Sequence, residues 1–408
     1  MKREVWIDWL RVSACFMVML VHSTEPFYLG GDGALILTRA DAFWAGLFDC
    51  LVRCCVPLFI VASSYLQFPL HYSTGEFLRR RAVRILIPFA FWSVFYALIW
   101  GKPVENLRDL LLNFNYAAGH LWFVYMLVGL YLMMPLLSPW AEKVSRRELQ
   151  VYLGIWLFTT VIPLLRDYLS GGQTTLVFGP TGIPRQGLYP LWGEASWNAY
   201  GVFYYISGVI GYLLLGLYFR RFLGDWSWRK TLLVAVPCWI GGFAIAYGGF
   251  LRRVFALAAP GAALPFAAGD LSVAVGWETT WCNDTVGVAL MTFGLLLLFR
   301  KIGPASVPAV GAPSAASPAS SAAPGAFYRR VLLPVSKASY GMYLMHLAIL
   351  VPISGWLRCA LGTGTAGVLG IWTTPVQILA AAVLSFLAAA LVSTLLQRIP
   401  KLGSWIIG

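Results

Sequence analysis

Long apolar runs recur along the whole chain, and they restrict its fold more than any other feature. Hydrophobic residues make up 59% of the 408 residues and charged residues only 12%. A helix needs about 20 mainly apolar residues to cross the hydrocarbon core of a bilayer. Backbone groups in lipid must be hydrogen-bonded within the chain, which a helix achieves. The sequence therefore predicts an all-α fold, a polytopic integral membrane helical bundle.

We expect about ten transmembrane helices. They cover approximately residues 7–27, 43–66, 82–100, 120–140, 149–165, 199–219, 231–250, 281–299, 331–353 and 375–399. The first eight lie in residues 1–302, and the last two, in 327–408, are expected to belong to the same bundle. Between these parts, 303–326 is almost wholly Ala, Pro, Ser and Gly, which predicts a disordered cytoplasmic linker.

Two further stretches are too polar or too interrupted to span. Residues 251–280 contain Pro260 and Pro265, so we interpret them as an outer loop, with a re-entrant segment as the alternative. Residues 166–198 are rich in Gly and Pro and contain Trp192 and Glu194. They are interpreted as an ordered outer loop that could cap a site.

The distribution of basic residues predicts the orientation of the bundle. The formal net charge is +13, and most Lys and Arg residues fall in alternate loops. By the positive-inside rule, both termini are cytoplasmic. The charge therefore reflects topology, and nucleic acid is excluded as a partner. A signal peptide is the competing interpretation of residues 1–27, but Asp8 and Arg11 interrupt its apolar run and no small-residue cleavage site follows.

The first span carries Asp8, Arg11, His22 and Glu25 in an otherwise apolar stretch. An ionisable side chain in a membrane usually faces a protein interior or a wet cavity and marks function. Eleven residues at roughly 100° each differ by about 20° from three turns, so Arg11 and His22 point the same way. They are about 16 Å apart along the axis. One helix face therefore connects the two sides of the membrane.

Three of the four histidines are expected at one depth on separate helices, namely His22, His120 and His346. An imidazole can accept a hydroxyl proton and return it near neutral pH. Glu25 is placed to orient His22, as a carboxylate steadies a catalytic base. The alternatives are that His120 and His346 are hydrogen-bonded core or interfacial residues, and that Glu25 is only solvated.

At the inner mouth, Arg11, Arg81 and Arg84 form a cluster suited to phosphates, which guanidinium groups bind in a bidentate manner. The alternative for the basic run 79–84 is a purely topogenic signal. In the ninth span, Ser339, Tyr343 and His346 make a polar stripe that should face the bundle interior. In the second span, Arg53 can pair with Asp49, four residues before it.

Several common motifs are absent from the sequence. We find no Walker loop, dinucleotide-binding glycines, HExxH motif or serine-hydrolase elbow. The carboxylates and the seven cysteines show no metal-ligand spacing, so we expect no metal.

Four stretches resemble the acyltransferase-3 family of polytopic bacterial inner-membrane acyltransferases, and in particular its enterobacterial common antigen O-acetyltransferase branch. They are IDWLRVSACFMVMLVHST (7–24), RCCVPLFIVASSYL (53–66), HLWFVYMLVGLYLMMPLL (120–137) and SYGMYLMHLAIL (339–350). Arg11 and His22 match the family's Arg-x10-His, and Arg81 and Arg84 match its Arg-x-x-Arg. Glu25, the linker and the loop 166–198 have no counterpart that we can match to the branch.

The resemblance implies O-acylation in the bacterial inner (cytoplasmic) membrane. An acyl group, usually acetyl, would pass from cytoplasmic acyl-CoA to a hydroxyl of a lipid-linked or cell-surface glycan. Arg11, Arg81 and Arg84 would bind the donor, here acetyl-CoA, and His22 would act as base or acyl relay with Glu25 beside it. We further expect substrate contacts from His120, Trp122, Ser339, Tyr343, His346 and Arg53. The alternative is a glycolipid transporter or flippase; a homo-oligomer is left open.

Overall fold

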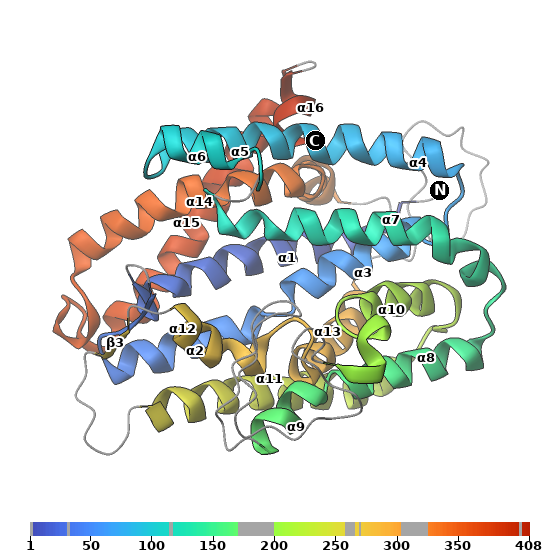
Figure 1. Cartoon of the computed structure of the whole chain (residues 1–408), viewed down its shortest axis with the longest axis horizontal. Helices are drawn as coiled ribbons and strands as arrows, with labels where there is room; N and C mark the ends of the chain where they lie inside the picture. The colour runs from blue at the N-terminus through green and yellow to red at the C-terminus, as the bar shows by residue number, and fades with distance from the viewer. Residues whose placement is uncertain are drawn as a thin grey trace.

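Long helices run side by side along the molecule in the computed structural model (Figure 1), which describes residues 3–30, 33–113, 117–169, 200–257, 266–268, 271–302, 325–399 and 402–408. Within these residues, eight helices are long and apolar enough to cross a membrane, and a bent helix pair makes a possible ninth. The prediction of a polytopic helical bundle is confirmed.

The helices of the first half are α1 (Val5–Thr24), α2 (Arg39–Val52), α3 (Cys55–Gln67), α4 (Thr74–Arg81), α5 (Ile87–Ile99), α6 (Pro103–Asp109), α7 (Trp122–Lys143), α8 (Arg146–Thr159) and α9 (Ile162–Leu169). Those of the second half are α10 (Ile210–Arg221), α11 (Trp228–Leu257), α12 (Leu271–Glu278), α13 (Val286–Phe299), α14 (Leu333–Leu361), α15 (Thr373–Leu396) and α16 (Leu402–Ile407). The strands are β1 (Leu29–Gly30), β2 (Gly33–Ile36) and β3 (Phe266–Ala268).

Helix α1 lies at the centre of the bundle. It packs against α2, α3, α14 and α15, and Figure 1 shows it running through the middle of the molecule. Leu10, Ala14 and Met19 on this helix are completely buried. A helix that is apolar almost all round becomes a core element. The side chains of Arg11 and His22 therefore face protein rather than lipid.

The expected sixth span, 199–219, is wrong as a continuous helix. Only α10 is α-helical there, and it is preceded by a short 3-10 helix, Gly201–Ile206. Gly201 and Gly208 have positive φ angles of 53° and 69°. Residues in this conformation cannot continue a right-handed helix. These two glycines explain the difference from the apolar pattern.

Two other regions differ in detail from the expected spans. The second is divided into α2 and α3 by a break at Arg53 and Cys54. In the stretch 251–280, α11 extends to Leu257, and the segment Val273–Trp281 forms a pair with Val286–Phe299 bent by 44°, as in a broken span or a re-entrant loop.

A small sheet, which the apolar pattern did not predict, joins this region to the end of α1. Strands β1, β2 and β3 are antiparallel in that order, with Ala34 opposite Ala268. Of the other expected features, residues 303–324 of the linker and 170–198 of the loop with Trp192 and Glu194 lie outside the described residues.

Candidate active site

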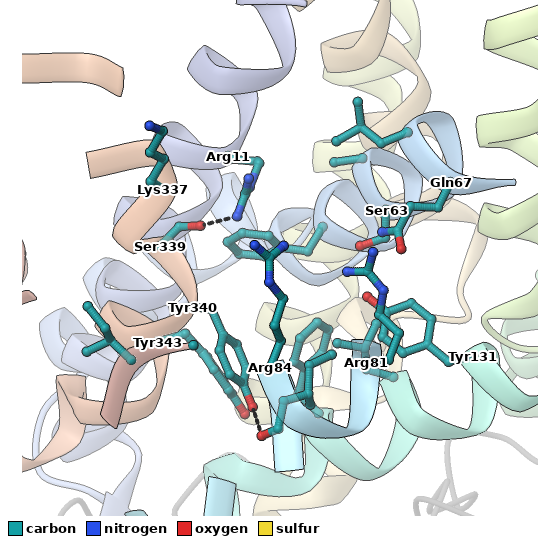
Figure 2. Close-up of a pocket in the computed structure, with 18 of the residues that line it drawn as sticks. Arg11, Ser63, Gln67, Arg81, Arg84, Tyr131, Lys337, Ser339, Tyr340 and Tyr343 are labelled. Atoms are coloured by element: carbon teal, nitrogen blue, oxygen red, sulfur yellow. Dashed lines mark hydrogen bonds between the residues drawn. The ribbon is translucent and has the colours of Figure 1, made fainter. Parts of the chain in front are cut away.

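A cavity of about 700 Å³ opens beside the N-terminal half of α1. Its walls come from α1, α3, the end of α4, α7, α14, α16 and the π-helical turn Ala82–Leu86 that connects α4 to α5. Figure 2 shows that Arg11 enters this space from α1, whereas Arg81 and Arg84 enter it from one continuous helical segment. The volume lies in the range of small-molecule sites, about 300–1,000 Å³.

The cavity is strongly cationic. Five basic side chains line it, from Arg3, Arg11, Arg81, Arg84 and Lys337, whereas none of the described lining residues is Asp or Glu. Polar side chains of Ser63, Gln67 and Tyr131 complete its wall. Such an excess of one charge sign in a partly enclosed space attracts an anion.

Arg11 is available to such an anion because the nearest acid on its own helix is already occupied. Asp8 accepts hydrogen bonds from Arg3 at 2.7 and 2.8 Å, from the Tyr328 hydroxyl at 2.6 Å and from the Ser336 hydroxyl at 2.6 Å. Arg11 instead donates from Nη2 to Oγ of Ser339, at 2.9 Å. Among the described residues, no carboxylate forms an ion pair with Arg11.

Arg81 ends α4, and Arg84 follows in the π-helical turn. Such turns often occur at functional sites. The Arg81 guanidinium lies 5.6 Å from the ring centre of Phe77 and 5.8 Å from that of Tyr131, and its Nε is buried without a hydrogen-bond partner. By contrast, Arg80 is paired with Glu76 and does not line the cavity. Adjacent arginines therefore have different environments.

The three histidines converge, as expected. The ring centres of His22 and His346 are 4.9 Å apart, those of His120 and His346 also 4.9 Å, and those of His22 and His120 6.3 Å. His346 and His120 are buried, at 0% and 5% exposure. Within the described part of the chain, no group of His, Cys, Asp and Glu has a geometry that could hold a metal ion.

His22 has the environment of an oriented base. Its Nδ1 lies 2.7 Å from Oε1 of Glu25. A carboxylate accepts hydrogen bonds, so in the neutral imidazole Nδ1 carries the proton and Nε2 holds the lone pair. The side chains of His22 and Glu25 are 17% and 31% exposed. This pair is therefore more accessible than the two other imidazoles.

Tyr343 separates the cavity from the histidines. Its ring lines the cavity beside Tyr340, as Figure 2 shows, while its hydroxyl donates to the carbonyl of His120 at 2.6 Å. None of His22, His120 and His346 is among the residues that line the cavity. The cationic cavity and the histidine cluster are thus adjacent compartments on either side of this residue.

Arg53 and Trp122 do not line the cavity. Arg53 forms ion pairs with Asp49 and Glu278, and its guanidinium lies 4.6 Å from the ring centre of Trp281. Asp49 also accepts a hydrogen bond at 2.8 Å from Thr24, at the end of α1. The guanidinium therefore joins α2, α12 and α1. Trp122 is half-buried at the start of α7.

Sequence reasoning missed Lys337, Tyr131 and Gln67 as lining residues. One signal was present for Tyr131, which follows His120 by eleven residues, the spacing that places Arg11 and His22 on one face. Lys337 also gave a signal, as an ionisable residue within the expected span 331–353. Gln67 gave none, because it follows the expected span 43–66 and reaches the cavity only in the folded bundle.

Comparison with known proteins assigns the family. The comparisons with curated proteins and with solved structures found no match. A family model described as "Acyltransferase domain" matches residues 4–394, nearly the whole chain, including Arg11, Arg81 and Arg84 of the cavity and the three histidines. The chain therefore belongs to the acyltransferase-3 family of membrane acyltransferases.

Proposed function

We propose that this membrane acyltransferase is an O-acetyltransferase that uses cytoplasmic acetyl-CoA as donor. The observation that carries the proposal is the cationic cavity, in which Arg11, Arg81, Arg84 and Lys337 face one space without an acidic side chain among the described lining residues. Coenzyme A carries several phosphate groups, which guanidinium groups bind through two parallel hydrogen bonds. The thioester arm would extend from these phosphates along α1 toward the histidines.

The chemistry that we propose for His22 follows from its contact with Glu25. Nε2 of His22 takes the proton of an acceptor hydroxyl, the oxygen attacks the thioester carbonyl, and the carbon–sulfur bond breaks to release the CoA thiolate. In the second form of the mechanism, Nε2 itself attacks the thioester, and the acyl-histidine then passes its acyl group to the hydroxyl. Both forms need the free lone pair on Nε2, and in both the hydroxyl proton ends on the CoA sulfur, so no further reactant is required.

The acceptor that we propose is a hydroxyl of a lipid-linked or cell-surface glycan at the end of the bundle where His22 is accessible. Trp192 and Glu194 are the candidates for acceptor selection. The four sequence stretches described above support membership of the enterobacterial common antigen O-acetyltransferase branch and a location in the bacterial inner membrane with both termini cytoplasmic.

The test is transfer of labelled acetyl from acetyl-CoA in membranes that contain the protein. We expect His22→Ala to lower transfer by about 10²-fold or more, the usual contribution of a general base. His71→Ala is the matched control, because this fourth histidine contacts Arg220 and lies away from the cavity and the histidine cluster. Normal transfer by His22→Ala at equal expression would exclude the role of His22, and absence of transfer by the unmodified protein would exclude acetyl-CoA as donor.

A further inference from the structure

In the histidine cluster, Nε2 of His346 has no partner and no assigned role. His346 has 0% exposure, and its Nε2 forms no hydrogen bond. Buried polar atoms in folded proteins are almost always hydrogen-bonded, so each exception calls for an explanation. The other ring nitrogen, Nδ1, is hydrogen-bonded, so the unpaired Nε2 calls for an explanation.

The other ring nitrogen fixes the protonation pattern of His346. Nδ1 is hydrogen-bonded to the backbone carbonyl of Tyr343, one turn earlier on α14. A carbonyl only accepts, so Nδ1 donates its proton there and Nε2 holds the free lone pair. The imidazole is thus arranged to receive a proton at Nε2 without losing its bond to the backbone.

His346 lies at the border of the histidine cluster, between the rings of His22 and Tyr343. Its ring centre lies 4.9 Å from that of His22, on the accessible side. On the other side, Tyr343, whose carbonyl holds its Nδ1, lines the cationic cavity. If the thioester arm passes Tyr343 as proposed above, its sulfur reaches the cluster on the side of His346, and the acceptor hydroxyl approaches the more accessible His22.

We propose that His346 is a second catalytic residue, which protonates the thiolate leaving group of the donor. The inference rests on the proposed function. The hydroxyl proton moves to Nε2 of His22, then to Nε2 of His346, and finally to the sulfur as the carbon–sulfur bond breaks. The acceptor gains the acyl group, the donor leaves as a thiol, and both imidazoles return to their neutral forms.

His120 is a weaker candidate for this role. Its Nδ1 is also buried without a partner, but its ring centre is 6.3 Å from that of His22. Its Nε2 lies 3.5 Å from the carbonyl of Leu344, at the limit of a hydrogen bond. Like His346, it lies beside the ring of Tyr343, with 6.1 Å between ring centres, so its greater distance from His22 is what makes it the weaker candidate.

The experiment uses His346→Asn, because an asparagine amide can replace Nδ1 at the Tyr343 carbonyl but has no group at the position of Nε2. Membranes that contain the protein and their own glycans as acceptor are supplied either with acetyl-CoA or with S-(4-nitrophenyl) thioacetate, whose thiolate leaves without needing a proton. We expect His346→Asn to lose at least about 100-fold of its activity with acetyl-CoA, in the range for a lost general acid. With the nitrophenyl donor it should stay within about fivefold of the unmodified protein.

His22→Asn supplies the comparison, since loss of the base should lower transfer from both donors. Equal activity of His346→Asn and the unmodified protein with acetyl-CoA would overturn the inference. So would equal losses with both donors, measured on variants with an unchanged unfolding temperature. Failure of the unmodified protein to use acetyl-CoA would instead refute the proposed function, and is distinguishable from both outcomes.

Discussion

The assignment of the cavity to the donor is tested most directly by two adjacent arginines. Arg81 lines the cavity and has a buried Nε without a partner, whereas Arg80 is paired with Glu76 outside it. Replacing either residue by Ala removes the same charge from the same segment of the chain. General electrostatic attraction predicts that both replacements weaken acetyl-CoA binding to a similar degree. A specific phosphate contact predicts a large loss of affinity for Arg81→Ala alone.

The expected size follows from the contact that would be lost. A hydrogen bond to a charged group contributes about 1.5–3 kcal/mol. Because about 1.4 kcal/mol corresponds to a factor of ten in Kd, Arg81→Ala should weaken acetyl-CoA binding about 10- to 140-fold. Arg80→Ala should stay within about twofold, since its exposed ion pair contributes little. Arg81→Lys should fall between them because Lys keeps the charge but loses the planar, two-pronged geometry.

The assay is equilibrium binding of acetyl-CoA to the purified protein in lipid nanodiscs at constant salt. The unfolding temperature of each variant is measured in parallel to confirm that the bundle is intact. Equal losses at Arg80 and Arg81, or unchanged affinity in Arg81→Ala, would refute a specific phosphate contact at this position.

Three further predictions concern stability and topology. Asp8→Ala should lower the free energy of unfolding by about 1–3 kcal/mol, because it leaves the buried hydrogen-bond donors around Asp8 unsatisfied. Asp8→Asn should lower it less. Equal thermal stability of the unmodified protein and both variants would contradict a stabilising role of the hydrogen bonds to Asp8. Gly341→Ala should displace α16, since a Cβ there would collide with Ile407. Gly355 on the same helix has open space, so Gly355→Ala should be tolerated. Limited proteolysis should cleave the C-terminal segment faster in Gly341→Ala than in Gly355→Ala. Reporter fusions at both termini should be active in the cytoplasm, and an outer location would contradict the positive-inside argument.

The sequence by itself determined the features that depend on local periodicity and on the cost of charge in a membrane. The apolar runs predicted the helical bundle, and the spacing of Arg11 and His22 placed them on one face of a single helix. The stripe of Ser339, Tyr343 and His346 was predicted in the same way. These inferences hold because neighbours on one helix are related by a constant rotation and rise.

Only the tertiary structure decided which helix faces meet. Asp8 is occupied by Tyr328 and Ser336, which lie 320 and 328 residues away, and this leaves Arg11 without a carboxylate. Arg53 is likewise paired with Glu278, 225 residues away. Periodicity shows which residues share one face of a single helix. Which faces then pack together depends on the shapes and hydrogen-bond partners of side chains from the whole bundle. The excess of basic side chains in the cavity therefore arises from pairings that the linear sequence does not contain.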